Sequence, residues 1–251
     1  MARRTRFSPA LLMGLLLATT SSLASDYQVS PVRVDIHGRV RTAVLTVHNQ
    51  GQEPLRLQVS AFSWEQTPRG EIQLDATQDV SFFPSLLTLE PGQTRNVRVG
   101  VASGAGDAER TYRLIIEQLP PRVRDGSEPP GVRVLTRMSI PIFVAPVSKS
   151  STGVLEKPCT REGTLAFAVR NTGSTHFMVR EVRVRGLDAQ GSVVMEQQLP
   201  GWYVLAGGRR EYALPLEPRV AHRVERFTID AHTNGPTLST QTGEADRTCP
   251  W

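Results

Sequence analysis

The sequence predicts an all-β fold made of two antiparallel sandwiches, and three observations support this prediction. Short runs that alternate apolar and polar residues recur along the chain, they are rich in Val, Ile and Leu, and turn sequences separate them. No segment sustains helical periodicity over three turns. Many short strands at regular spacing indicate antiparallel sandwiches rather than a parallel α/β sheet. The clearest runs are residues 32–36, 44–48, 55–59, 97–101 and 182–185.

The first segment, residues 1–24, has the pattern of a secretory signal peptide. Three arginines within its first six residues precede an apolar run of about eight residues at 11–18. Ser22 and Ala24 place small residues at −3 and −1 of a cut before Ser25. The apolar run is far shorter than the roughly twenty residues that span a bilayer. We therefore expect an exported protein without an integral membrane segment.

A weak internal repeat predicts two domains of similar topology. The turn at Asn49 and the turn at Asn171 each follow a strand pattern and precede another, and residues 87–92 resemble residues 203–208 in the same order. Asn and Gly suit such turns because they tolerate positive φ. Pro146 and the serine-rich residues after it are typical of a boundary. We predict an N-terminal immunoglobulin-like domain at residues 25–147 and a C-terminal one at residues 148–251.

The charge distribution argues against nucleic-acid binding. The chain has 29 Lys+Arg and 24 Asp+Glu, a net charge of +5, and three of the arginines lie in the signal segment. Residues 25–147 carry 13 charges of each sign, and residues 148–251 carry 13 basic and 11 acidic residues. A nucleic-acid-binding domain normally concentrates a basic stripe, and neither half has that excess.

The two cysteines, Cys159 and Cys249, are predicted to form a disulfide, because an even pair in an exported chain favours one. The bond would tie the start of the second domain to the C-terminus. Five histidines show no ligand spacing and no Cys-x-x-Cys occurs, so we expect no metal site.

The common catalytic motifs are absent from the sequence. It lacks a Gly-x-Ser-x-Gly elbow, the phosphate-binding and dinucleotide-binding glycine patterns, and His-Glu-x-x-His. Scattered carboxylates on turns and strands are more simply explained as solvated surface. We therefore expect a binding or assembly protein rather than an enzyme.

Residues 111–146 are the most informative stretch. A strand pattern ends at the double proline 120–121, a charged loop follows, and residues 132–144 then read as one long strand. The even positions of that strand form a nearly continuous apolar row, and Pro141 lies within the strand at an odd position. A proline within a strand is tolerated mainly at a sheet edge, where an apolar row is an aggregation hazard if it is unused. The row either packs in the core of the first sandwich or is lent to a partner's incomplete sheet.

Here the sequence resembles a known family, the PapD-like periplasmic pilus-assembly chaperones of the chaperone–usher pathway. The resemblance covers essentially the whole chain after the signal segment. It is carried by the order and spacing of Arg33, Asn49, the Leu-Glu-Pro-Gly turn at 89–92, the strand from Tyr112 to the double proline, and the long strand that closes at Pro146. The departures at residues 122–131 and 139–144 are more similar to the archaic, Csu-like branch.

The resemblance implies two immunoglobulin-like domains set in an L and a function in capturing pilin subunits. The last strand of the first domain would complete the pilin's sheet by β-strand addition. The chaperone would hold subunits folded in the periplasm and deliver them to an outer-membrane usher, without ATP or another cofactor. It would be a monomer when loaded. The donor positions here are Val132, Val134, Thr136, Met138 and Ile140.

The family also anchors the pilin's C-terminal carboxylate with two basic residues in the cleft. Arg33 matches the first by its spacing from Asn49, and a guanidinium holds a carboxylate bidentately. The family lysine falls at Pro141, so the second anchor is missing from its usual place. Arg137, on the same side of the strand, is the expected substitute, and Arg98 is a more distant candidate.

Two alternatives stay open at the level of the sequence. One is an exported immunoglobulin-like structural or adhesin subunit of a surface appendage. The other is a glycan-active β-sandwich enzyme, which predicts acids and aromatics gathered in one groove, although the chain offers only three Trp and four Tyr.

Overall fold

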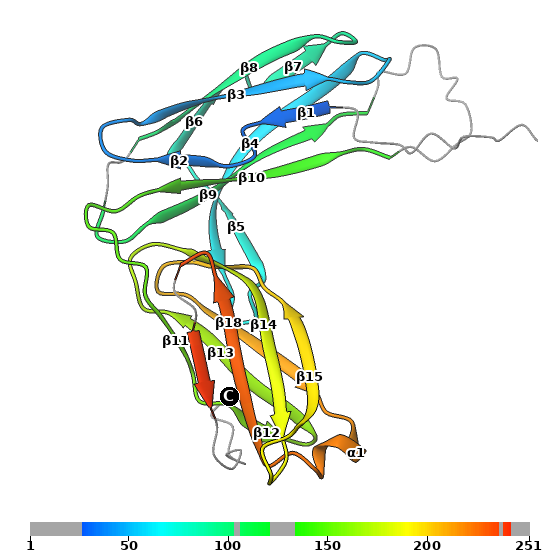
Figure 1. The fold of residues 1–251 in the computed structure, drawn as a ribbon. Helices are drawn as coiled ribbons and strands as arrows, with labels where there is room; N and C mark the ends of the chain where they lie inside the picture. The colour runs from blue at the N-terminus through cyan, green and yellow to red at the C-terminus, as the bar shows by residue number, and fades with distance from the viewer. Residues whose placement is uncertain (1–26, 103–105, 121–133, 236–237, 242–251) are drawn as a thin grey trace, which may run out of the picture.

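The computed structural model describes residues 27–102, 106–120, 134–235 and 238–241. It confirms the predicted all-β class. Two β-sandwiches follow one another along the chain and meet at an angle, which gives the molecule the shape of an L (Figure 1). The predicted boundary at 147/148 falls between the last strand of the first sandwich and the first strand of the second. The predicted signal peptide lies outside the described residues.

Two sheets form the first sandwich. One sheet has the strand order β1-β3-β8-β6, and the other has the order β2-β10-β9-β4-β5 with β7 also paired to β4. Their bounds are β1 Tyr27–Ser30, β2 Val34–Ile36, β3 Thr42–Asn49, β4 Leu55–Gln66, β5 Ile72–Ala76, β6 Val80–Phe83, β7 Leu86–Leu89, β8 Thr94–Val101, β9 Arg110–Gln118 and β10 Arg137–Val144. Alternating side chains of both sheets fill the core between them.

The second sandwich is built in the same way. In one sheet β13 pairs with β11, β12 and β17, and in the other β14 pairs with β15, β16 and β18, which in turn pairs with β19. Their bounds are β11 Gly153–Leu155, β12 Cys159–Arg161, β13 Thr164–Asn171, β14 Phe177–Leu187, β15 Val193–Pro200, β16 Tyr203–Val204, β17 Arg209–Pro215, β18 Arg226–Thr233 and β19 Leu238–Gln241. A single turn of helix, α1 (Pro218–Ala221), links β17 to β18.

The internal repeat has a structural counterpart in two buried asparagines. Asn49 ends β3 and Asn171 ends β13, with exposures of 0% and 1%. Asn49 donates from Nδ2 to the carbonyls of Glu53 and Leu89, and Asn171 donates to those of Thr175 and Val204, all at 2.9–3.0 Å. Each Oδ1 also accepts from the backbone N–H two residues later. The same side chain therefore closes the same turn in both sandwiches.

A third apolar cluster joins the two sandwiches. Trp64 and Phe143 come from the first sandwich and pack against Tyr203 and Leu205 of the second. The rings of Trp64 and Tyr203 meet edge-on at 5.7 Å, and Phe143 stacks on His176 at 3.7 Å. These aromatic contacts place the inner end of the second sandwich against the β4–β9–β10 sheet face of the first.

Candidate functional site

The outer edge of β10 is only partly covered. β9 pairs antiparallel with β10 along residues 137–144, whereas β2 pairs with it only at residues 142–144. Thr136 O accepts a 2.9 Å bond from Gln118 N, so the even residues direct their backbone groups to β9 and the odd residues to the other edge. No described strand pairs with that outer edge before residue 142. It can therefore receive a further strand.

The expected long strand is shorter in the structure. β10 begins at Arg137, and residues 134–136 have no strand assignment, although Thr136 still bonds to β9. Val132 lies outside the described residues. The physical reason is that the inner partner strand β9 ends at Gln118, so the residues before Thr136 have no described strand to pair with on either edge.

The apolar row of β10 divides into two parts. Val134 is 69% exposed, Thr136 is half-buried, and Met138 packs against the margin of the first core. Ile140 is only 2% exposed and belongs to that core. The assignment of Ile140 as a donor residue is therefore wrong, since its side chain already fills the sandwich that carries it.

The opposite face of β10 points into the cleft between the sandwiches. Pro141 pairs with Arg113 of β9, and Val34 pairs with Ile142, which sets Arg33 level with Pro141 on the other side. Side chains at paired positions share one face of a sheet. Neighbouring strands lie about 4.8 Å apart, so the Cα atoms of Arg33 and Arg113 are roughly 10 Å apart with the proline between them.

Arg113 is the buried cation of the cleft. It is 4% exposed, its guanidinium lies 3.7 Å from the centroid of Trp64, and Nη1 donates to Ser139 O at 3.4 Å. Its Nε and Nη2 have no hydrogen-bond acceptor among the described residues. Burial lowers the pKa of Arg113 to about 10, and the nearby Tyr203 phenol opposes that shift. Arg113 therefore presents two buried N–H donor groups, Nε and Nη2, that could bind an acceptor.

Arg33 is more accessible and already ion-paired. Nη2 lies 2.6 Å from Oδ1 of Asp35, and the guanidinium lies 4.8 Å from the centre of the Phe143 ring. The hydrogen bond with Asp35 raises the pKa of Arg33, and Tyr203 adds to this effect. Arg33 and Arg113 therefore both lie within the electrostatic reach of Tyr203, which the second sandwich supplies.

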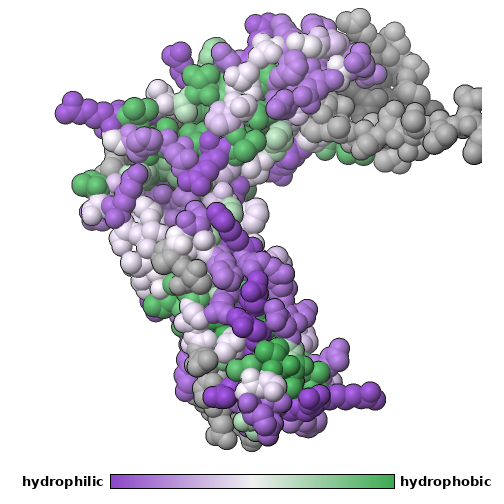
Figure 2. Space-filling model, viewed as in Figure 1, coloured by the Kyte–Doolittle hydropathy of each residue, from purple (hydrophilic) through white to green (hydrophobic). Residues whose placement is uncertain are grey.

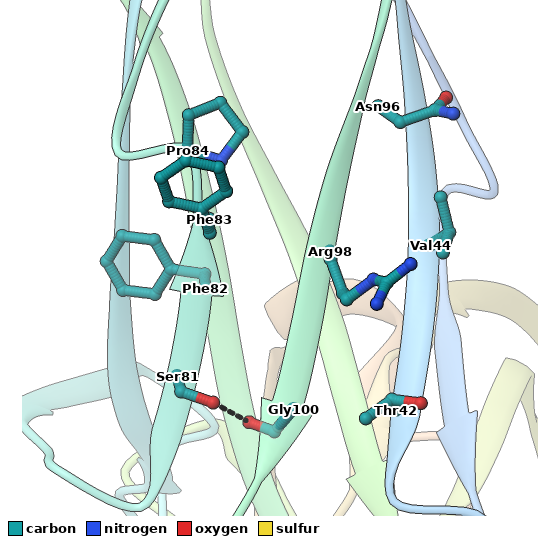
Figure 3. Close-up of a pocket in the computed structure, with 9 residues that line it drawn as sticks. All are labelled: Thr42, Val44, Ser81, Phe82, Phe83, Pro84, Asn96, Arg98 and Gly100. Carbon is teal, nitrogen blue, oxygen red and sulfur yellow. Dashed lines mark hydrogen bonds between the residues drawn. The ribbon is translucent and has the colours of Figure 1, made fainter.

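The other two basic candidates lie elsewhere. Arg137 is more than half exposed, is 3.9 Å from the carboxylate of Glu117, and sits four residues, or about 13 Å, along the strand from Pro141. Arg98 belongs to the other sheet, where it faces a surface pocket of about 510 Å³ together with Val44 and Phe83 (Figure 3). Neither geometry fits a pair with Arg33.

Two basic residues of the cleft, Arg113 and Lys149, are not among the candidates that the sequence indicates. Arg113 interrupts the apolar run of the central strand β9, and a charge in such a run was the available signal. Lys149 lies in the segment between the sandwiches and lines, with Arg33, Phe143 and His176, a hollow of about 350 Å³. Nothing in the sequence pattern distinguishes Lys149 from a linker lysine.

The predicted disulfide involves one described and one undescribed residue. Cys159 opens β12 and is 1% exposed. Cys249 lies outside the described residues, so its pairing with Cys159 stays a prediction. Within the described ranges, no group of three His, Cys, Asp or Glu side chains could hold a metal ion, and no helix is long and apolar enough to cross a membrane.

These features define a two-sandwich, immunoglobulin-like β protein with an open strand edge beside a basic cleft. Residues 26–149 match the family described as "Pili and flagellar-assembly chaperone, PapD N-terminal domain". The first sandwich therefore belongs to the pilus-assembly chaperones, a non-enzymatic family, and the match supports a chaperone role in pilus assembly. No curated protein sequence matches the chain significantly.

Solved structures of pilus chaperones share the whole fold. A chain from the Acinetobacter baumannii CsuC–CsuE chaperone–tip subunit complex of archaic Csu pili matches with a TM-score of 0.58 and 15% identity, covering 84% of this chain and 97% of that one. The class 5 fimbriae chaperone CfaA gives 0.57 and 10%, covering 86% and 98%. A chain from the Salmonella enterica SafA pilin–SafB chaperone complex gives 0.54 and 15%, covering 88% and 99%. Such similar scores do not separate the branches, so the archaic assignment stays a prediction.

Proposed function

We propose that this chaperone captures pilin subunits by lending them the outer edge of β10. The observation that carries the proposal is the edge from residue 134 to residue 141, which no described strand covers and which continues a fully paired sheet. An incoming strand would bond to the odd-numbered residues. The exposed side chain of Val134 and the half-buried side chains of Thr136 and Met138 would fill the gap in the subunit.

We propose further that Arg33 and Arg113, rather than Arg33 and Arg137, hold the subunit's C-terminal carboxylate. The unpaired Nε and Nη2 of Arg113 support this assignment, because buried donors without acceptors are costly and a carboxylate would satisfy them. Pro141, which stands where the family lysine does, has a side chain too short to obstruct the two guanidiniums. Arg33 would exchange part of its contact with Asp35 for the ligand.

The cellular setting is part of the same proposal. Pilus chaperones of this family are periplasmic, and the predicted signal segment supports that location here. Delivery to an outer-membrane usher, exchange-driven release without a cofactor, a monomeric loaded state and the absence of enzymatic activity are proposed on the same basis. The concave side of the L, where a subunit would lie, is visible in Figure 2.

The strand-donation proposal is tested with two neighbouring residues. Val134→Asp places a charge in the row that would enter the subunit, whereas Leu135→Asp places the same charge on the opposite side of the strand. The pilin would be co-expressed with each variant, and co-purification would be measured. We expect Val134→Asp to reduce capture at least tenfold and Leu135→Asp to have little effect. Equal capture by Val134→Asp and the wild type would overturn the proposal.

A further inference from the structure

A hairpin of the first sandwich reaches across to the second. β4 and β5 extend beyond the body of the first sandwich, and Figure 1 shows them beside the upper end of the second. Thr67 O accepts from Gly70 N at 2.8 Å, which closes a tight turn with Pro68 at its second position. Gly70 has a φ of +84°, a conformation that glycine adopts without strain. The hairpin is thus a well-formed arm.

Gln66 is the last residue of β4, next to the turn of this arm, and it binds the backbone of β16 and of the residue after it at two points. Its Nε2 donates to Tyr203 O at 2.8 Å, and its Oε1 accepts from Leu205 N at 3.1 Å. These two groups flank Val204. Because the Gln66 carboxamide binds one backbone acceptor and one backbone donor, it fixes both the position and the direction of this strand. The contact joins two residues 137 and 139 positions away in sequence.

The tip of the arm makes a second, independent contact with β17. Pro68 O accepts from Glu211 N at 2.8 Å, so the arm covers a backbone group at the open edge of β17. A Cβ atom added to Gly70 would collide with the guanidinium of Arg210. The end of the arm therefore holds β16 through Gln66 and β17 through Pro68.

The strand held by Gln66 carries Tyr203. The Tyr203 ring packs on Trp64 and Phe143, and these two rings lie against the guanidiniums of Arg113 and Arg33. Any rotation of the second sandwich about the joint would carry Tyr203 away from these groups. Rings alone resist such rotation weakly, because apolar contacts have little directionality. Directional hydrogen bonds restrain it more strongly, and they come from the arm and from Glu109, which binds His176 and Ser174 of the second sandwich.

We infer that the β4–β5 arm, through Gln66 and its tip, sets the angle between the two sandwiches and keeps Tyr203 beside the cleft arginines. Gln66 is a positioning residue in this role, and it acts through the backbone of β16. The inference concerns the chaperone alone. It stands whether or not Arg113 anchors a subunit, because it depends only on contacts within this chain.

The test measures a distance between the two sandwiches that changes with the angle between them. Spin labels are placed at Val44→Cys on the first sandwich and Val193→Cys on the second, both exposed sites, and the distance between them is measured by pulsed electron paramagnetic resonance. We expect one narrow distribution for the parent protein. Gln66→Met, which keeps the length of the side chain and removes both hydrogen bonds, should widen the distribution at least twofold. Arg210→Ala, which removes the guanidinium beside Gly70 and keeps the Pro68–Glu211 hydrogen bond, should widen it less.

Gln73→Met is the matched control, because Gln73 is an exposed residue on the same hairpin. It should leave the distribution unchanged. A second readout follows Trp64 emission in a Trp202→Phe, Trp251→Phe background, where Gln66→Met should shift the emission to longer wavelength as Tyr203 moves away. An unchanged distance distribution and unchanged Trp64 emission in folded Gln66→Met would overturn the inference. Equal widening in Gln73→Met would also overturn it, since the effect would then not depend on the Gln66 contacts.

Discussion

Arg113 lies directly across the β9–β10 ladder from Pro141, on the face that the first sandwich turns toward the second. The cationic group of the cleft is therefore one strand away from the position where the family resemblance locates a lysine. Because Pro141 and Arg113 are paired, their Cα atoms are separated by only one inter-strand spacing, about 4.8 Å. An arginine side chain is long enough to span that distance.

Arg113→Met should make the free chaperone more stable and a poorer binder. A buried guanidinium with two unpaired nitrogens costs folding energy, which its contact with Trp64 offsets only in part. We expect the free energy of unfolding to rise by about 1–2 kcal/mol in urea titrations and capture of co-expressed pilin to fall at least tenfold. A variant that lost stability and kept full capture would contradict the anchoring role.

Arg33→Ala should weaken pilin capture much more than Arg137→Ala. Arg33 is level with Pro141 in the cleft, whereas Arg137 lies farther along the strand beside Glu117. Arg183→Ala serves as a further control, because Arg183 pairs with Glu181 on the second sandwich. Co-purification yields against a common pilin provide the measurement. Similar losses in Arg33→Ala and Arg183→Ala would remove the anchoring role of Arg33.

Asn171→Ala should destabilise the second sandwich by roughly 2–4 kcal/mol, because three hydrogen bonds of a buried side chain are lost and their partners are left unsatisfied. Asn96→Ala is the comparison, since Asn96 is exposed and makes one side-chain contact, with Thr46. Its effect should stay below about 0.5 kcal/mol. Thermal and urea unfolding distinguish the two variants, and equal losses would show that the turn does not depend on Asn171.

Stability should decline between pH 10 and pH 12. Burial raises the pKa of Tyr27 to about 12 and that of Tyr112 to about 12. The unfolded chain releases these protons near pH 10, so the folded form binds more protons in this interval and loses stability as the pH rises. Tyr27 alone corresponds to a loss of about 2–3 kcal/mol across the interval.

Tyr27→Phe tests that decline. The phenol of Tyr27 donates to Ile116 O at 2.6 Å inside the first core, and phenylalanine keeps the ring and cannot ionise. The free energy of unfolding of this variant, measured by urea titration at each pH, should fall less steeply than that of the parent above pH 10. An identical slope would show that Tyr27 does not titrate in this range.

The fold was predictable because the signal is local and repeated. Alternating patterns and turn residues define strands wherever they occur, and Asn49 and Asn171 mark the same turn in both sandwiches. The open edge also had a local signal, an apolar row along a strand that contains a proline. The sequence could not predict where the donor part of that row ends. Whether Ile140 fills its own core or a partner's depends on where the neighbouring strands stop.

The basic site and the joint were not predictable in the same way. Choosing between Arg137 and Arg113 requires the register of β9 against β10, which no local pattern defines. The grip of Gln66 on the backbone around Val204 connects segments nearly 140 residues apart, and a backbone partner leaves no trace in the sequence. Glutamine at the end of a strand looks like any solvated polar residue.

The short open edge of β10 also bears on whether unloaded copies of this chain can pair with one another. β2 covers its C-terminal end and Pro141 lacks the amide proton that a continuing ladder would need. A second copy of this chain could therefore bond to only a few residues before its strand met an obstruction. We expect this stretch to be long enough to pair with the proposed subunit strand and too short to start a fibre of stacked copies. The same eight residues, 134–141, therefore provide the open edge and limit how far another copy can pair with it.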